Sequence, residues 1–412
     1  MSDARAHLAG QRCNGWISSQ VAAFPGGLAD FTSAPVPLAM TATRASQLIR
    51  SGANPPKNTD TPAPRRIESL DFVRGLALIV ILIDHIEMVT GRQIFSRFTL
   101  RHIGLSDGLD AFVFVSGMVF GVVHGRAQNK GFLPSQMKAL RRAGCLVVAN
   151  TCVFAVTLLI SCSIFPNPDS EGIMRIGRAI DSPLRSIVDT LTMQYQPFGF
   201  DILPMYAVIL VIAPTILWVS RRNMLGAIAL STCLYMMTIA YPDATFFRCG
   251  EEPWSYQPLA WQAVFVMGMI LPSFIARDWS SKTYWRTLVL TLIALFVVSL
   301  SAQWAFQILQ QNQLLWLAGR SIPGVLRMAH FSLIALFVFS ALNLGLARQV
   351  KKGFHWIGLM GRRSLPAFMA GLLITYWVAL SGERSSAGVL LFEFQGVLIM
   401  FAASVLAPGW LR

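Results

Sequence analysis

The chain has 412 residues, of which 54% are hydrophobic and only 13% are charged, about half the charged share of an average soluble domain. A water-soluble fold of this length could not bury so much apolar surface, so the composition excludes an ordinary soluble enzyme and indicates an integral membrane protein. The net charge of +14 comes from 34 Lys and Arg in short connections between apolar segments, a placement that follows the positive-inside rule and excludes a nucleic-acid partner.

The first 66 residues form a polar N-terminal region. They are rich in Ala, Pro, Ser, Thr and Gly, and they lack both the apolar core of a signal peptide and the periodicity of a packed helix. We therefore expect residues 1–66 to be a disordered cytoplasmic tail and residues 67–412 to be the membrane domain. The cysteines show no CxxC pair and no metal-ligand spacing, which predicts neither a disulfide framework nor a metal site.

Apolar segments long enough to cross a bilayer, about 20 residues each, recur from residue 70 onward. The sequence therefore predicts an all-α integral membrane protein, a bundle of about ten transmembrane helices. The predicted spans are residues 70–90, 106–124, 143–165, 200–219, 223–241, 257–276, 286–308, 327–347, 365–382 and 388–407. Residues 187–200, within the longest connection, are expected to enter the membrane or to pack on its surface.

The connections between these spans alternate in charge. One set carries Lys and Arg with Asp278 as its only acid, while most acids lie in the other set. With the tail in the cytoplasm, the positive-inside rule then predicts that both termini are cytoplasmic.

Residues 70–85 of the first span carry four ionisable residues at membrane depth, where each costs a few kcal/mol. Arg74 and His85 are eleven positions apart, so they return to within about 20° of one helical face and lie roughly 16 Å apart along the axis. Asp71 precedes Arg74 by three positions and can pair with it there. Asp84 projects about 100° away from His85, and we expect it either to orient His85, if the helix bends, or to pair with a neighbouring helix.

Each of these residues alone has a structural explanation. Arg74 could extend to the inner headgroups, and His85 could be a satisfied core histidine. The occurrence of both residues on one helical face, with two flanking carboxylates, favours a functional site instead.

The first outer connection breaks the charge rule. It contains Arg92, Arg97, Arg101 and His102, with no acid between residues 90 and 105. Arg97 and Arg101 are four positions apart, so a short helix would place them side by side. They either pair with acids elsewhere, such as Asp107, or bind an anionic ligand.

Three polar residues mark the second span. Asp107 and Asp110, near its outer end, either bind acceptor hydroxyls or cap a helix. Ser116 precedes Gly117, and such a pair in a membrane span usually marks close helix packing, although Ser116 is also a candidate for substrate binding.

Later spans contain weaker candidates. His330 follows Arg327 at helical spacing, and it either lines the site or packs in the core. Trp261 and Gln262 could form a platform on which the substrate binds. More commonly, an aromatic residue of this kind lies at the membrane–water interface. Glu393 lies within the last span and must face protein or water.

The segment that opens the membrane domain resembles the start of the OpgC family. The resemblance is carried by Leu70-Asp71-Phe72-x-Arg74-Gly75 through Asp84-His85, by Phe98-Thr99-Leu100-Arg101, and by Ser106-Asp107-x-x-Asp110-Ala111-Phe112-Val113-Phe114-x-Ser116-Gly117. It continues, more weakly, through Trp261-Gln262, Pro323 to His330 and Gly361 to Phe368, and so covers nearly everything after the tail. The spacing of Arg74 and His85 is also similar to the Arg-x10-His motif of the wider superfamily of integral-membrane O-acyltransferases.

OpgC proteins are linked to succinyl modification of osmoregulated periplasmic glucans. The resemblance therefore implies transfer of an acyl group, succinyl, from cytoplasmic acyl-CoA to a sugar hydroxyl of a periplasmic glucan. The protein would lie in the bacterial inner membrane, with the lipid bilayer, acyl-CoA and the glucan as partners. Succinyl-CoA would be a donor substrate, and no tightly bound cofactor is implied.

The resemblance also suggests roles for the candidate residues. His85 would act as general base on the acceptor hydroxyl or carry the acyl group transiently, with Asp84 setting its orientation. Arg74, Asp71 and Arg126 would hold the donor near the cytoplasmic face. The substrate-binding residues would be Asp107, Asp110, Ser116, Arg97, Arg101 and His330. Because a succinyl group presents a free carboxylate, the two arginines would favour it over acetyl.

Two other classes of function remain open. A transporter or flippase could use the same intramembrane Asp, Arg and His as a relay, and it would show vectorial flux without consuming acyl-CoA. A structural or sensory subunit would tolerate replacement of His85. The chain contains no GxSxG, Walker or HExxH motif of soluble enzymes.

Overall fold

The computed structural model describes residues 68–129, 131–163, 174–241, 248–249, 252–274, 280–312, 314–346 and 353–408. The tail predicted for residues 1–66 lies outside this range. The described residues are helical apart from turns, connections and one antiparallel pair of two-residue strands, β1 (Arg248–Cys249) and β2 (Glu252–Pro253). The predicted all-α class is therefore confirmed.

All ten predicted spans coincide with helices, although they differ in length and hydropathy. Seven helices among the described residues are long and apolar enough to cross a membrane. They are α4 (Gly108–Gln128), α5 (Phe132–Ser163), α9 (Ile202–Ser220), α12 (Ser281–Gln311), α13 (Val325–Asn343), α16 (Ser364–Ser381) and α17 (Ser386–Leu406). Two more, α10 (Met224–Ala240) and α11 (Pro258–Phe274), are apolar but have 17 residues each. The tenth, α2 (Glu68–Thr90), is long enough but carries several charged residues.

Short helices fill the connections. They are η1 (Ser96–Phe98), α3 (Leu100–Ile103), α7 (Gly177–Asp181), α8 (Pro183–Leu191), η2 (Leu315–Ala318) and α15 (His355–Arg362). The predicted surface segment falls partly on α8, which packs against α5 while Leu184, Val188 and Leu191 remain exposed. Its continuation turns inward, and Phe200 is completely buried.

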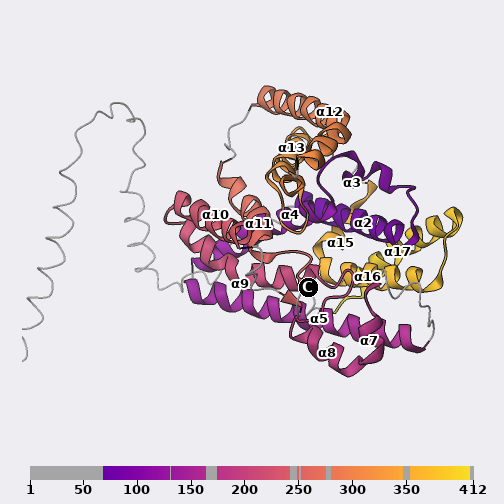
Figure 1. Cartoon of the computed structure of the whole chain (residues 1–412). Coiled ribbons are helices and arrows are strands. Elements are labelled where there is room, and N and C mark those ends of the chain that lie inside the picture. Colours follow the sequence, from indigo (N-terminus) through magenta and orange to yellow (C-terminus); the bar gives the residue numbers. More distant parts are fainter. Residues whose placement is uncertain are drawn as a thin grey trace, which may run out of the picture. The chain divides into compact units, whose positions relative to one another are not determined.

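Helix α2 is surrounded by other helices. It packs against α4, α15, α16 and α17 (Figure 1), and its buried residues include Asp84, His85 and Glu87. Protein, and not lipid, therefore surrounds the ionisable side chains near its C-terminal end, as their desolvation cost requires.

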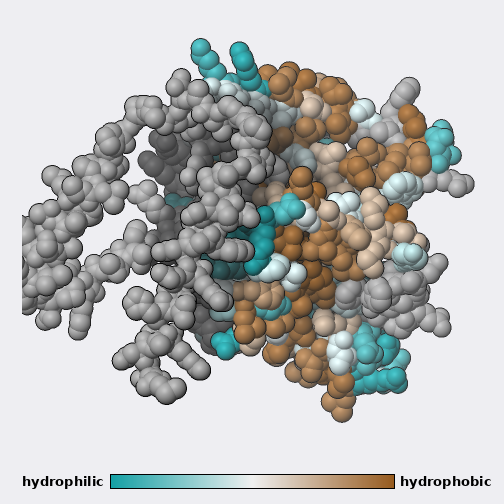
Figure 2. Space-filling view, turned by 90° about the vertical axis from the view of Figure 1, so that its left-hand side faces the viewer, coloured by the Kyte–Doolittle hydropathy of each residue, from teal (hydrophilic) through white to brown (hydrophobic). Residues whose placement is uncertain are grey.

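The outside of the bundle is apolar, as expected for contact with lipid. Figure 2 shows hydrophobic residues over much of the described surface, with hydrophilic residues in smaller groups. Helix α12 contributes strongly to this surface, since Leu290, Phe296 and Leu300 are each more than 60% exposed. Such side chains are stable in hydrocarbon but would promote aggregation in water.

Helix α15 lies against α2 with almost no space between the two backbones. A Cβ atom on Gly75 would lie 1.9 Å from the carbonyl oxygen of Ile357, and one on Gly361 would lie 1.7 Å from that of Asp71. Only glycine fits such an approach, which is the small-residue packing typical of membrane helices. The contact fixes the start of α16, which follows α15 directly, beside Arg74.

We expect Gly361→Ala to destabilise the protein by about 1–3 kcal/mol, because the added methyl group forces the α2 and α15 backbones apart. Thermal unfolding in detergent, followed by tryptophan fluorescence, measures the effect. Gly144→Ala on α5 is the matched control, since a Cβ there meets nothing within 4 Å. Equal unfolding temperatures for Gly361→Ala and the wild type would contradict this account of the contact.

Candidate active site

His85 is buried near the C-terminal end of α2, with 7% of its surface exposed. The ring of Phe198 meets the imidazole edge-on, with the ring centres 5.3 Å apart. Within the described residues no side chain or backbone group forms a hydrogen bond with the imidazole. The charges of Arg320, Arg101 and Asp107 act on it, but no described residue occupies either ring nitrogen.

Asp84 contacts a neighbouring segment and not His85. Its Oδ1 accepts a hydrogen bond from Thr99 Oγ1 at 2.8 Å, and Thr99 connects η1 to α3. Of the two expected arrangements the structure thus shows the second type, pairing with another element. Asp84 also lines a cavity of about 230 Å³ at the end of α2, here called the α2 cavity.

Glu87 holds the basic connection in place, and the sequence interpretation missed it. Its carboxylate accepts hydrogen bonds from the backbone nitrogens of Ile94 at 2.7 Å and Phe95 at 2.5 Å, and from Ser96 Oγ at 2.5 Å. A fifth ionisable residue in the predicted span was the signal that could have found it. Glu393 on α17 is buried and faces Glu87. The sequence alone did not indicate which residue Glu393 would contact.

Arg74 lies at the other end of α2 and points into the bundle. Its Nη2 donates to Ser364 Oγ at 2.7 Å, and its guanidinium lies 5.5 Å from the centre of the Phe112 ring. These contacts argue against the structural alternative for Arg74, in which its side chain extends to the headgroups. Asp71 acts electrostatically on Arg74, while its Oδ2 lies 3.8 Å from Arg362 Nε of α15. Asp71 and Arg362 line a cavity of about 310 Å³.

Asp107, Asp110 and Arg327 form a buried ion cluster where α4 and α13 begin. Arg327 Nη2 lies 2.6 Å from Asp110 Oδ2 and 2.9 Å from Asp107 Oδ2, and its Nη1 donates to the Leu105 carbonyl at 2.9 Å. Asp107 also accepts from the backbone of Leu109, and Asp110 accepts from that of Asp107. The capping interpretation therefore describes both acids, and their carboxylates are already occupied by Arg327.

Arg320, which the sequence interpretation did not select, joins the cluster from the connection before α13. Its Nε lies 3.0 Å from Asp107 Oδ2. Burial would raise the pKa of Asp107, but Arg320 and Arg327 outweigh it and hold that pKa at about 2. Asp107 is therefore a permanent anion between two cations.

The remaining candidates of the later spans are packed within the protein. His330 Nδ1 lies 2.9 Å from Ser106 Oγ, beside the ion cluster. Trp261 is completely buried and Gln262 is bonded to Ser231, so both side chains pack inside the protein.

Ser116 is buried next to a close helix contact. A Cβ on the adjacent Gly117 would lie 2.0 Å from the carbonyl oxygen of Phe265 on α11. The packing interpretation of the Ser-Gly pair thus describes its surroundings. Arg126 lies in α4, but its side chain is outside the described part of the chain.

The two arginines of the basic connection face different cavities. Thr99 is extended between η1 and α3, so no continuous helix places Arg97 beside Arg101. Arg101 lines the α2 cavity, and Arg97 lines a cavity of about 520 Å³ next to α17. Both terminal nitrogens of Arg101 lie 3.5 Å from Met88 Sδ. In the described structure no acid pairs with it, and Asp107 and Asp110 are taken by other arginines.

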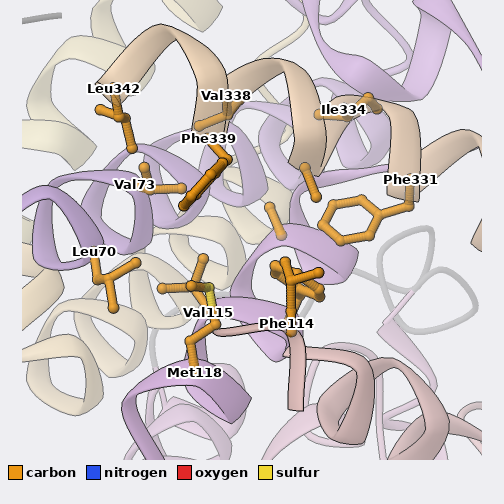
Figure 3. A pocket seen from close by; sticks show the side chains of 13 residues that line it. Leu70, Val73, Phe114, Val115, Met118, Phe331, Ile334, Val338, Phe339 and Leu342 are labelled. Carbon is orange, nitrogen blue, oxygen red and sulfur yellow. The ribbon is translucent and has the colours of Figure 1, made fainter. Parts of the chain in front are cut away.

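An apolar cleft of about 70 Å³ lies between α2, α4, α11 and α13 (Figure 3). Its walls are Leu70, Val73, Ala111, Phe114, Val115, Met118, Leu271, Phe331, Ile334, Ala335, Val338, Phe339 and Leu342. Side chains from α2 and α4 point toward those of α13 across it. Since every lining residue is apolar, the cleft suits hydrocarbon and offers no group for chemistry.

The site residues thus form two groups joined by α2. At one end, Asp84 and Arg101 line the α2 cavity, and His85 follows Asp84 on α2. Arg74 and Asp71 lie about three to four turns away along α2, and Arg74 contacts the start of α16. The arrangement places a cation toward one end of α2 and an imidazole toward the other.

Comparison with known proteins identifies a family. A family model described as OpgC protein matches residues 65–411. No curated protein and no solved structure shows significant similarity to the chain.

Proposed function

The chain belongs to the OpgC family, whose members are membrane acyltransferases, and we propose that it moves a succinyl group from cytoplasmic acyl-CoA to a sugar hydroxyl of a periplasmic glucan. The observation that carries this proposal is the geometry of α2. A cation, Arg74, and an imidazole, His85, lie on one helix that is enclosed by protein, and Asp84, next to His85 in the chain, lines a polar cavity. The protein would lie in the inner membrane, which has the acyl-CoA donor on its cytoplasmic side and the glucan acceptor on its periplasmic side.

The Arg74 end of α2 suits the donor. Arg74, Arg362 and His355 bring positive or protonatable groups to this end, and Arg362 and His355 line the same cavity. Coenzyme A carries phosphates, which bind well to guanidinium groups. We assign this end to the cytoplasmic face, with Arg126 on the same side through α4.

The His85 end suits the chemical step. In the proposed reaction the neutral imidazole accepts the proton of a sugar hydroxyl as its oxygen attacks the thioester carbonyl carbon. The C–S bond then breaks, and the departing thiolate of coenzyme A takes the proton from the imidazolium. Attack of His85 itself on the thioester, giving a transient acyl-histidine, uses the same open ring nitrogens. Asp84 would influence this step because it lines the α2 cavity and fixes Thr99 by a hydrogen bond.

Arg101 is the side chain best placed to recognise a succinyl carboxylate. It lines the α2 cavity, and its charge acts on both Asp84 and His85. Within the described residues the hydrogen bonds of its terminal nitrogens go to a sulfur alone, so a ligand carboxylate could accept two parallel hydrogen bonds from them. The other carboxylates of the cavity are engaged, Glu87 with backbone nitrogens and Asp84 with Thr99.

A transporter or flippase remains the alternative function. The buried ions around α2 would then form a relay. Purified protein in detergent distinguishes the two, since only an acyltransferase consumes acyl-CoA there when an acceptor sugar is present.

We expect His85→Ala to lower the rate of acyl transfer by roughly 100- to 10,000-fold, because the reaction loses its general base. Transfer of the acyl group from acyl-CoA to glucan, measured on purified protein, tests this. His124→Ala is the matched control, since His124 is also buried but lies on α4 with Ser135 as its partner. Normal transfer by folded His85→Ala would contradict the mechanism.

We expect Arg101→Gln to reduce the use of succinyl-CoA far more than any use of acetyl-CoA, because only the succinyl group has a carboxylate for the guanidinium to bind. Arg97→Gln should change this ratio less, since Arg97 faces the other cavity. The ratio of kcat/KM for the two donors is the measurement. An equal loss for both donors in Arg101→Gln would indicate a structural role.

We expect both termini to be cytoplasmic, because basic and acidic connections alternate along the chain. A reporter enzyme that is active only in the periplasm should be inactive when fused after Arg412 and active when fused in the connection between α10 and α11. Periplasmic activity at the C-terminus would overturn the ten-span orientation.

A further inference from the structure

The backbone of the basic connection between α2 and α3 is fixed from two sides. The carboxylate of Glu87 on α2 accepts hydrogen bonds from the backbone nitrogens of Ile94 and Phe95. Arg92 Nε donates to the carbonyl oxygen of Arg384, in the connection between α16 and α17, at 2.5 Å. The arginines of the basic connection therefore extend from a backbone that is already in place beside the start of α17.

The cavity of about 520 Å³ next to α17, here called the α17 cavity, brings two cations together with an apolar helix. Arg92, Gln93 and Arg97 line it from the basic connection, and Ser386 and Leu390 line it from α17. Both arginines are exposed, and within the described residues neither forms an ion pair. Two guanidinium groups that face one open cavity without a counter-charge favour an anionic ligand there.

The acids near the α17 cavity are engaged with backbone groups. Glu383, in the connection before α17, accepts a hydrogen bond from the backbone nitrogen of Ser385 at 2.7 Å, and Glu87 binds the backbone of the basic connection. Among the described residues no acid lines the cavity itself. Its positive charge is therefore left for a ligand to neutralise.

The surface that continues from the cavity along α17 is apolar. Leu390, in the cavity wall, is followed at helical spacing by Phe394 and Leu398 on the same face. Phe394 is 66% and Leu398 51% exposed, and Phe98 of the basic connection is 77% exposed. A row of exposed apolar side chains that begins at a cationic cavity matches the two parts of a lipid, its acyl chains and its charged headgroup.

We propose that the α17 cavity binds the headgroup of an anionic phospholipid, whose acyl chains lie along the exposed face of α17. Arg92 and Arg97 donate hydrogen bonds to its phosphate oxygens. A zwitterionic headgroup binds less well, because its own cation lies close to the two arginines. The lipid supplies the counter-charge that this all-basic outer connection, opposed by the positive-inside rule, lacks within the described protein.

Native mass spectrometry of the purified full-length protein in detergent tests the proposal, with phosphatidylglycerol and phosphatidylcholine of identical acyl chains as probes. We expect the wild type to bind the first phosphatidylglycerol more tightly than the first phosphatidylcholine. Arg97→Gln should weaken phosphatidylglycerol binding about fivefold, and the double variant Arg92→Gln/Arg97→Gln about 25-fold, with little change for phosphatidylcholine. Arg97→Gln should fold, because Arg97 forms no hydrogen bond within the described residues, and thermal unfolding verifies this.

Arg222→Gln is the matched control, since Arg222 is also an exposed arginine but stacks on Trp218 in the connection after α9; it should bind phosphatidylglycerol as the wild type does. Equal binding of the two lipids by the wild type, or unchanged phosphatidylglycerol binding by folded Arg97→Gln, would overturn the proposal. Glycerol phosphate that binds as tightly as the lipid would show a site for phosphate alone and would overturn the assignment to lipid. Binding of glucan in place of phosphatidylglycerol, with its loss in Arg97→Gln, would overturn it as well.

Discussion

The cost of placing charge at membrane depth is the constraint on which this structure depends. Helix α2 carries Asp71, Arg74, Asp84, His85 and Glu87 within 17 consecutive residues, and none of them is stable against lipid. The bundle meets this cost by enclosing α2 with α4, α15, α16 and α17. The same need to replace water with protein explains the glycine contacts between α2 and α15 and the hydrogen bonds that Glu87 accepts.

The enclosure also separates two kinds of charged residue. Glu87 and Arg327 have their hydrogen-bonding capacity filled by backbone groups and carboxylates, and they stabilise the fold. His85, Arg101 and Arg320 are positioned by the same elements but keep donors or acceptors free within the described structure. An unpaired buried polar group is costly, and a ligand that bonded to His85 would remove that cost.

Local sequence patterns predicted the parts of this structure that depend on one segment. Hydropathy located all ten helices, and helical periodicity placed Arg74 and His85 along one face of α2. Contacts between distant segments could not be predicted in this way. Asp107 and Arg320 are 213 positions apart in the sequence, and Arg97 and Arg101 were separated by the extended backbone of Thr99, which their spacing does not reveal. Trp261 donates a hydrogen bond to the connection before α13, a contact between distant segments that its position in the sequence does not reveal.

The activity that we propose for this membrane protein is acylation of a periplasmic glucan. It can be tested by mass spectrometry of glucans from a strain that lacks the protein, compared with the same strain carrying the restored wild-type chain. We expect the succinyl mass to be absent from the glucans of the deletion strain and to return on restoration. Glucans with the same succinyl content in both strains would contradict it.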